Sequence, residues 1–532
     1  MPNSLSKCLQ LVDTPAMRPL LRSIVRGLEK ESLRVTPAGM LAQTPHPSCL
    51  GSALCNPYIT TDYSEALLEF ITPPQQDIPS LLTGLDDLHR FTYQCLDEEL
   101  LWTASMPCIL RGDENIPVAR YGHSNIGRMK TVYRLGLGYR YGRAMQTIAG
   151  IHYNFSLPDA FWESYGGALG NTLPLQAFKN QQYLALIRNF RRYAWLLIYL
   201  FGASPALCRS FLGDQAHNLD AFDQATLYHP HATALRMGKL GYQSSAQEGI
   251  VVPYNSLEAY IGALTQLLTR QDATYQRVGT RGPDGQWRQL STALLQIENE
   301  FYTTIRPKQP IRSGEAPILA LAERGIEYVE VRALDVNPYL PLGIDSSQLR
   351  LLDLFLLYCL LLPSPDLDAD EYHECQANMG TVVDSGRMPG LQLQRAGAAV
   401  SLQAWAGELL GGLAQIAQLL DGDQPGAPYG AAVQLQQRKL ADPWLTPSGM
   451  IMSDLALNER SWYHFAMEQS QLHAEEFRRR PLSAERAAFF QDAARQSLED
   501  QARAEQASEP PFEEFLQHYY QQYHRFPAAP LN

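Results

Sequence analysis

The stretch GIEYVEVRALDV, residues 325–336, decides how the fold of this chain is read. Its polar and apolar residues alternate as in a β-strand, where successive side chains point to opposite faces. Glu330 and Arg332 therefore share one face, while Val329 and Val331 point to the other. A carboxylate beside a guanidinium suits a polar cavity that handles metal ions and phosphate. For a single strand of this kind, an ordinary solvated sheet face is the alternative.

The same pattern recurs in two segments near the start of the chain, which favours the cavity. In LEKESLRV, residues 28–35, Glu29 and Glu31 share a face and lie roughly 6.5–7 Å apart along the strand. In ALLEFI, residues 66–71, Glu69 interrupts an apolar run, and Asp62 precedes it by seven residues. Carboxylates so placed repel one another or are costly to bury, unless a cation binds between them.

A fourth segment adds a histidine to these acids. In TIAGIHYNFSL, residues 147–157, His152 and Asn154 belong to the polar face, and Tyr153 and Phe155 to the apolar one. A lone strand histidine is more often structural than a metal ligand. Beside carboxylates on similarly built strands, a ligand becomes the better interpretation, and this donor set suits Mg²⁺ or Mn²⁺.

Composition limits the partners of the chain. Its 532 residues have a formal net charge of −12, which argues against nucleic acid or an anionic membrane surface as the main partner. Nucleotides are not excluded, since local cations can hold them. The eight cysteines contain no Cys-x-x-Cys pair, as expected of reduced thiols. The start has no signal-peptide pattern, and the most apolar run, 354–362, is too short to span a bilayer. We expect a cytoplasmic protein.

The chain reads as two differently built portions of a single domain, 1–532. Residues 1–345 mix strands with helices at 81–100, 175–200 and 256–270, and the clear alternation predicts a mainly antiparallel sheet. Residues 346–532 are expected to be mainly helical. Helices are predicted at 346–362, 398–420, 459–480 and 484–507, with a loop at 422–430. The charged tail from Glu475 reads as a solvated surface helix rather than a binding device.

Two glycine-rich stretches are near misses for phosphate-binding loops. In GHSNIGRMKT, residues 122–131, the Lys-Thr pair comes two residues too late for a P-loop. In GLGYRYG, residues 136–142, one residue too many separates the glycines for a dinucleotide-binding turn. If ATP binds, metal-bound carboxylates and basic residues must hold it. Arg306, Lys308 and Arg312, in a short basic loop before the 325–336 strand, are the candidates, with solvated surface as the alternative.

Longer matches indicate a family. The chain resembles glutamate–cysteine ligases of the gammaproteobacterial type, with dense matches from about residue 26 to the 360s and weaker similarity beyond. The matching stretches are 26–34, 51–54, 59–72, 146–157, 201–206, 295–300 and 325–337.

The resemblance implies a glutamine-synthetase-like α+β fold, in which a curved, mainly antiparallel sheet forms a funnel-shaped active site surrounded by helices. It also implies ATP-dependent ligation of the glutamate γ-carboxylate to the cysteine amine through a γ-glutamyl phosphate, the first step of glutathione biosynthesis. The implied cofactor is Mg²⁺, or Mn²⁺, as two or three ions. We expect a monomer whose partners are ATP, glutamate and cysteine.

The resemblance also assigns roles residue by residue. Arg332 and Glu330 would be catalytic, with Arg332 near the transferred phosphoryl group. Arg236 would bind glutamate. The implied metal ligands are Glu29, Glu31, Asp62, Glu69, His152 and Glu330. The implied cysteine pocket consists of Tyr63, Tyr133, Leu137, Gln146, Tyr242 and Tyr302.

One departure from the family pattern bears on specificity. The family has phenylalanine where this chain has Tyr63, and an added hydroxyl there could loosen the preference for cysteine.

Two alternatives to the ligase stay open at this stage. One is a glutamate–amine ligase with a different amino-acid acceptor, and the other is a catalytically inactive binding protein of the same fold.

Overall fold

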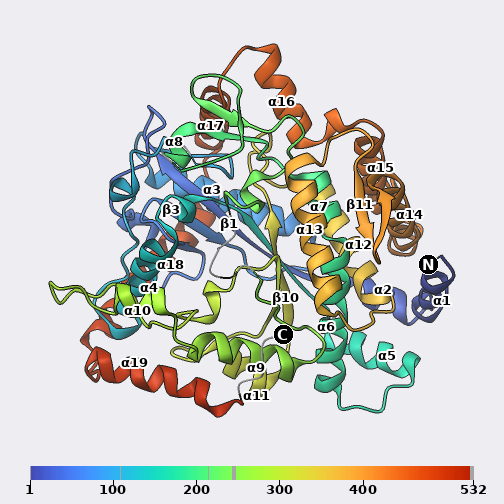
Figure 1. Cartoon of the computed structure of the whole chain (residues 1–532), viewed down its shortest axis with the longest axis horizontal. Helices are drawn as coiled ribbons and strands as arrows, with labels where there is room; N and C mark the ends of the chain where they lie inside the picture. Colours follow the sequence, from blue (N-terminus) through green and yellow to red (C-terminus); the bar gives the residue numbers. More distant parts are fainter. Residues whose placement is uncertain (1, 108, 214, 242–246, 248, 528–532) are drawn as a thin grey trace.

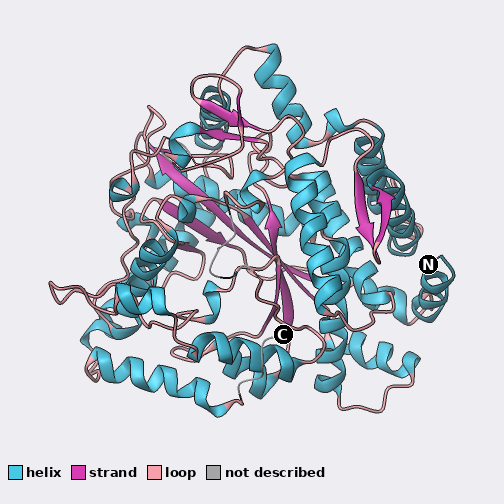
Figure 2. Cartoon of the chain, in the orientation of Figure 1, coloured by secondary structure: helices cyan, strands magenta, loops and turns pink. Residues whose placement is uncertain are grey.

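A seven-stranded sheet lies at the centre of the computed structural model (Figures 1 and 2). The structure describes the chain except for residues 1, 108, 214, 242–246, 248 and 528–532. The strand order is β2-β3-β1-β5-β10-β9, and β4 pairs with β1 off this path. Each of these strand pairs is antiparallel, which confirms the predicted sheet type.

The strands of this sheet come from distant parts of the sequence. They are β1 (Val25–Val35), β2 (Ile59–Thr61), β3 (Leu67–Ile71), β4 (Leu100–Leu101), β5 (Ile151–Ser156), β9 (Ile305–Lys308) and β10 (Tyr328–Leu334). A smaller sheet contains β6 (Ala206–Cys208), β8 (Thr226–Tyr228) and β7 (Asp220–Ala221), and β11 (Gln392–Arg395) forms a hairpin with β12 (Ala398–Ser401).

Helices surround the sheet. In Figure 1, α6, α7, α12 and α13 lie to the right of the central strands, and α4 and α18 lie to the left. The helices are α1 (Pro2–Val12), α2 (Met17–Arg22), α3 (Ile78–Cys95), α4 (Asn125–Tyr141), α5 (Asp159–Leu169), α6 (Leu175–Tyr193), α7 (Trp195–Phe201), α8 (Arg209–Leu212), α9 (Leu257–Thr269), α10 (Ala273–Val278), α11 (Pro317–Arg324), α12 (Ser346–Leu361), α13 (Ala369–Ser385), α14 (Leu402–Asp421), α15 (Pro428–Ala441), α16 (Pro447–Leu457), α17 (Trp462–Arg479), α18 (Ala484–Gln506) and α19 (Phe512–Gln521). No helix in the described ranges has the length and apolar character needed to cross a membrane.

The face of the sheet opposite the predicted cavity is sealed by buried packing and ion pairing. Val329 and Val331 of β10 are fully buried, as their alternation predicts. Arg26 of β1 pairs with Asp353 of α12 at 2.7 Å, with both side chains almost completely buried. Breaking a buried pair of this kind leaves an uncompensated charge, so the pair fixes α12 against the sheet.

Several predicted element boundaries are wrong. The helix expected at 81–100 ends at Cys95. The last two residues of the expected span, 100–101, are instead a short strand that pairs with β1. The helix expected at 175–200 is two helices, α6 and α7, separated at Ala194. The predicted basic loop around Arg306 is instead the edge strand β9, paired with β10. Pro307 is tolerated there because an edge strand has one side free of ladder bonds.

The portion after residue 345 is mainly helical, as expected, but it also contains a β-hairpin that was not predicted. Residues 398–401, read as the start of a helix, form strand β12 of a hairpin. The two-residue loop of that hairpin, Ala396 and Gly397, has φ of +52° and +75°. Positive φ at both loop residues matches the twist of the flanking strands. The helix α15 also begins inside the predicted 422–430 loop.

Candidate active site

A cavity of about 650 Å³ opens on the polar face of the sheet. Its lining includes residues of β1, β2, β3, β5, β9 and β10, together with α4, the 297–302 segment and the 311–317 loop. Fifteen of the residues given roles from the sequence line it: Glu29, Glu31, Asp62, Tyr63, Glu69, Tyr133, Leu137, Gln146, His152, Tyr302, Arg306, Lys308, Arg312, Glu330 and Arg332.

Strand register brings the acids together. Glu31 of β1 is directly opposite Glu69 of β3, and Glu29 of β1 is directly opposite His152 of β5. On the other side of β5, Glu330 of β10 is opposite Asn154. Directly opposed like charges destabilise a sheet, so the Glu31–Glu69 pair needs either a proton or a cation.

His152 lies at the centre of the acidic cluster. Its Nδ1 is 3.1 Å from Glu29 Oε2 and 3.8 Å from Glu330 Oε1, and its Nε2 is 3.8 Å from Glu31 Oε1. Ligand atoms of Glu29, His152 and Glu330 lie within 4.8 Å of one another, as do those of Glu31, Glu69 and His152. Two adjoining ligand groups thus share one histidine.

The cluster contains acids that resist ionisation. Burial, with the neighbouring Asp62 charge, raises the pKa of Glu31 to about 7. Burial also raises the pKa of Glu69 well above its usual value, and the charges of Glu29, Asp62 and Glu31 add to that effect. At neutral pH Glu31 is therefore only partly ionised and Glu69 holds its proton, unless a cation takes the place of the protons.

Glu330 is different because cations already face it. Lys308 Nζ lies 3.4 Å from Glu330 Oε1, and Arg332 Nη1 lies 3.1 Å from Glu330 Oε2. Burial alone would raise the pKa of Glu330, but the attraction of Lys308 and Arg332 outweighs it and holds that pKa well below its usual value. Glu330 is therefore an ionised group that orients Arg332 at the cavity wall.

The donor set fits a hard divalent cation. Carboxylate oxygens with one imidazole nitrogen are ligands that Mg²⁺ and Mn²⁺ accept. Two ligands are held by neighbouring groups: Glu29 Oε1 accepts from Asn154 Nδ2 at 2.8 Å, and Glu31 Oε2 accepts from the Gly150 backbone N–H at 2.6 Å. Such contacts orient metal ligands. Glu29, Glu31, Glu69, His152 and Glu330 would hold the ions, with Asp62 beside Glu31.

Mg²⁺ binding to this cluster is expected to strengthen as pH rises from about 5 to about 8 and to release protons. The folded-state pKa of Glu31, about 7, lies above its usual value, so the ion-free protein keeps this proton until the pH passes that value. An incoming cation must displace the proton, and less work is needed once the group is ionised. Calorimetry at pH 6.5 in two buffers of different ionisation enthalpy measures the protons released. A pH-independent affinity without proton release would contradict the expectation.

Basic residues form the wall next to Glu330. Arg306, Lys308 and Arg312 all line the cavity. The Arg306 side chain is fixed by donation from Nη2 to the Asn299 carbonyl at 2.9 Å, and its buried Nε has no partner in the described part of the chain. A wall of cations next to a cluster of carboxylates is suited to a polyphosphate bridged by metal ions.

Aromatic residues form the remaining wall. Tyr133 and Leu137 lie one helical turn apart on α4, and Gln146 Nε2 donates to the Tyr302 hydroxyl at 3.0 Å. The Tyr63 hydroxyl is buried and has no hydrogen-bond partner among the residues that the structure describes. It occupies space left by Gly138, where a Cβ would lie only 2.5 Å from the hydroxyl oxygen.

Two residues with predicted roles do not line the cavity. Arg236 lies behind it: Nε is 2.7 Å from Asp335 Oδ1, and Nη2 donates to the Leu334 carbonyl at 2.8 Å. The Arg236 guanidinium also packs against Gly150, where a Cβ would meet Nη2 at 2.8 Å. Tyr242, assigned to the cysteine pocket, is outside the described residues.

Sequence reasoning missed two cations on α4. Lys130 and Arg134 line the cavity together with Tyr133 and Leu137. Burial lowers the pKa of Lys130 to about 8. Lys130 belongs to the stretch that fails as a P-loop, but as part of helix α4 it still faces the cavity. The spacing of Lys130, Arg134 and Leu137 by four and three residues, which puts them on one helical face, was the available signal.

The C-terminal helices also reach the cavity, which corrects the interpretation of the tail as solvated surface. Ala504 of α18 and Tyr519 of α19 belong to the lining. The Ser52 backbone N–H donates to Ser497 Oγ at 2.9 Å, and the Asn125 N–H donates to Glu509 Oε2 at 2.7 Å. The tail therefore fixes two loops, around residues 52 and 124, at the cavity rim.

An antiparallel sheet with a cluster of acids and a wall of cations on one face is the arrangement expected of a glutamine-synthetase-like ligase. Residues 9–382 match the sequence model of the family described as "Glutamate-cysteine ligase". The chain belongs to the glutamate–cysteine ligase family.

Comparisons with individual proteins support the same family. The chain is 52% identical over 501 residues to the glutamate–cysteine ligase of Pseudomonas putida (strain W619), covering 94% of this chain and 95% of that one. The crystal structure of glutamate–cysteine ligase from Francisella tularensis in complex with AMP has a TM-score of 0.89 at 34% identity, covering 94% and 98%. A bifunctional glutathione synthetase from Pasteurella multocida shares the fold, with a TM-score of 0.71 at 24% identity over 90% of this chain and 57% of that one.

Proposed function

We propose that this chain joins the γ-carboxylate of L-glutamate to the amine of L-cysteine, with ATP converted to ADP and phosphate, as the first step of glutathione biosynthesis. The observation that carries the proposal is one cavity in which opposed carboxylates meet around His152 while Lys308 and Arg332 face Glu330. Membership of the glutamate–cysteine ligase family supports it.

The chemistry explains why this arrangement is needed. A carboxylate does not react with an amine at a useful rate, because the oxygen that must leave is a poor leaving group. Transfer of the ATP γ-phosphoryl group to glutamate gives an acyl phosphate, from which the amine of cysteine expels phosphate. Phosphoryl transfer depends on alignment and on neutralising charge. Divalent ions, two or three in number, would supply that charge neutralisation when bound.

The residues of the chain divide this work. Arg332 is held by Glu330 with part of its guanidinium exposed to the cavity, so it can donate to the transferring phosphoryl group. Lys308, Arg306 and Arg312 neutralise the remaining phosphates. The role predicted for Arg236, binding the glutamate carboxylate, stays a prediction, because its guanidinium lies behind the cavity and pairs with Asp335. The wall formed by Tyr63, Tyr133, Leu137, Gln146 and Tyr302 receives cysteine, with Tyr242 as a further predicted member.

An omission assay tests the proposed reaction. ADP release is expected only when ATP, glutamate, cysteine and Mg²⁺ are all present, with no release above background when any one is left out. Mn²⁺ in place of Mg²⁺ compares the two ions. If a different amino acid replaced cysteine at a higher rate, the acceptor assignment would be wrong. If no acceptor supported ADP release, the protein would be a binding protein instead.

Replacing Tyr63 by phenylalanine is expected to raise the free energy of unfolding by about 1 kcal/mol, because the variant no longer buries a hydroxyl without a partner. We also expect kcat/KM for cysteine over L-2-aminobutyrate to rise about 3- to 10-fold, since the pocket loses a polar group that accepts varied side chains. Chemical denaturation and competition kinetics measure the two effects. An unchanged ratio with lowered stability would mean that the hydroxyl serves a structural purpose.

We further propose that residues 1–532 form one ligase domain. One large hydrophobic core cluster, with two small satellite clusters, includes residues from Leu5 to Tyr523, which supports the proposal. The monomeric state and cytoplasmic location expected from the sequence stay predictions.

A further inference from the structure

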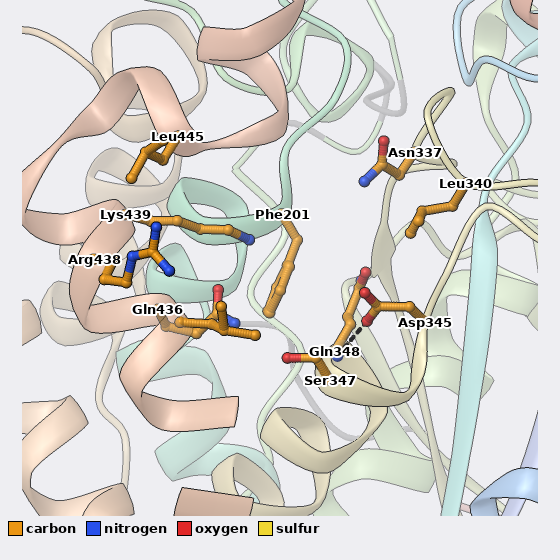
Figure 3. Close-up of a pocket in the computed structure, with 11 residues that line it drawn as sticks. Phe201, Asn337, Leu340, Asp345, Ser347, Gln348, Gln436, Arg438, Lys439 and Leu445 are labelled. Carbon is orange, nitrogen blue, oxygen red and sulfur yellow. Dashed lines mark hydrogen bonds between the residues drawn. The ribbon is translucent and has the colours of Figure 1, made fainter. Parts of the chain in front are cut away.

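A second pocket, with no residue in common with the active-site cavity, lies where α7, α12 and α15 meet (Figure 3). Its volume is about 240 Å³. Its walls come from the end of α7, the start of α12, the end of α15 and the connection that follows β10. The lining residues are Phe201, Asn337, Leu340, Asp345, Ser347, Gln348, Leu435, Gln436, Arg438, Lys439 and Leu445.

Polar atoms in this pocket lack partners. Within the described part of the chain, Gln436 Oε1, Gln348 Nε2 and Ser347 Oγ are buried and have no hydrogen-bond partner. Gln348 and Gln436 are only 4% and 2% exposed. Buried polar atoms in folded proteins nearly always have a partner, and here the residues that carry the unpaired atoms come from two helices and line one small space. A ligand, or water, must complete their hydrogen bonds.

Opposite charges also face the pocket without pairing. Lys439 Nζ donates to the Leu200 carbonyl at 3.1 Å and lies 4.7 Å from the centre of the Phe201 ring. Asp345 Oδ1 accepts from the Gln348 backbone N–H at 2.7 Å as the N-cap of α12. No ion pair joins Lys439 to Asp345 among the described residues, and burial lowers the pKa of Lys439 to about 8 while Asp345 opposes that effect. Each charge has capacity for a further partner.

The rest of the lining limits the ligand. Phe201, Leu340, Leu435 and Leu445 give the pocket an apolar side, and Leu435 and Leu445 are partly exposed at its mouth. The volume is smaller than the roughly 300–1,000 Å³ typical of drug-sized ligands, so a nucleotide does not fit. A simple anion would use only the remaining donor capacity of Lys439 and Gln348 Nε2, and a simple amine only the remaining acceptor capacity of Asp345 and Gln436 Oε1.

We propose that this pocket binds one free aliphatic α-amino acid as a zwitterion. Its carboxylate lies against Lys439, Gln348 Nε2 and Ser347 Oγ, and its ammonium group donates to Asp345 and Gln436 Oε1. Its side chain packs on Phe201 and the leucines. Figure 3 shows Lys439, Gln436, Ser347 and Phe201 pointing into the same space, with Asp345 and Gln348 opposite the α15 residues.

Calorimetric titration of the full chain with L-leucine and L-valine, without ATP, tests the proposal. We expect saturable one-to-one binding. The analogues 4-methylpentanoate, which lacks the ammonium group, and 3-methylbutylamine, which lacks the carboxylate, should each bind at least about tenfold more weakly than leucine. The variants Lys439→Met, Gln436→Leu and Asp345→Asn should each weaken leucine binding by about tenfold or more.

Two features make the test selective. Asparagine is as good an N-cap as aspartate, so Asp345→Asn removes the charge while retaining α12. Gln437→Leu, at the exposed neighbouring position of α15, is the matched control and should bind leucine as the unmodified protein does. Omission assays on the same variants should give unchanged ligase rates, which separates this pocket from the proposed reaction.

Three results would overturn the proposal. The absence of saturable binding up to about 10 mM, a weak affinity by any standard, would mean that the pocket holds water. Leucine binding that Lys439→Met and Asp345→Asn both leave intact would place the amino acid elsewhere. Equal binding of 4-methylpentanoate and leucine would make the pocket a site for simple carboxylates.

Discussion

Glu29→Gln is expected to lower kcat/KM by on the order of 100-fold or more while the protein remains folded. Glu29 accepts from Asn154 and is hydrogen-bonded to His152, and an amide of the same shape can still accept from Asn154. The fold therefore keeps its contacts, but one charged oxygen ligand of the cluster is lost. Steady-state kinetics at several Mg²⁺ concentrations, with thermal denaturation of the same sample, measure both effects.

A matched substitution keeps this result interpretable. Glu163 of α5 is exposed and lies outside the cavity lining, so Glu163→Gln should retain the normal rate. A Glu29→Gln enzyme with the normal rate at saturating Mg²⁺ would remove Glu29 from the metal ligands. A loss of activity with a collapse of the thermal transition would show only that Glu29 is structural. Glu31→Gln would then test the metal site, because the carboxylate of Glu31 faces Glu69 in the same cluster.

Arg332→Lys is expected to lower kcat by about 100-fold and to change KM for glutamate by about threefold or less. One guanidinium nitrogen, Nη1, donates to Glu330 Oε2 at 3.1 Å and lies 3.5 Å from His152 Nδ1. Lysine keeps the positive charge but has a single nitrogen, so it cannot pair with Glu330 through one nitrogen and donate to the phosphoryl group through the others of a planar fork. An interaction made mainly in the transition state affects kcat more than KM.

Kinetics with glutamate as the varied substrate provide the measurement, and Arg209→Lys, at an exposed position on α8, is the control. The opposite pattern, a large rise in KM with kcat retained, would assign Arg332 to glutamate binding. In that case Lys308, the other cation next to Glu330, would become the candidate for the phosphoryl group.

The period of two in the strands explains why much of the acidic cluster could be predicted. Glu29, Glu31, His152 and Glu330 face one cavity because alternation fixes the face of a strand residue whatever lies around it. The sequence could not show which strands are neighbours. The pairing of Glu31 with Glu69 and of Glu29 with His152 follows from a strand order that joins residues 38 and 123 positions apart in the sequence.

The cations that helix α4 adds to the cavity and the hairpin formed by β11 and β12 were harder to predict, each for a different physical reason. Lys130 and Arg134 enter the site because of where α4 packs, and local pattern does not contain that information. Residues 398–401 begin with two alanines, which favour a helix, but propensity is a weak preference that tertiary context overrides. The positive φ at Ala396 and Gly397 requires a hairpin turn there, and the Ala-Gly pair is a weaker turn signal than Asn-Gly.

The position of α18 and α19 at the cavity rim has a consequence for biosynthesis. A ribosome adds about 5–20 residues per second, so β10 emerges on the order of ten seconds or more before Tyr519. During that interval a nascent chain already contains every acid of the cluster but lacks the helices that fix the loops around residues 52 and 124. The cavity rim should therefore be complete only after α18 and α19 have been made, and we expect chains that stop before α18 to lack ligase activity.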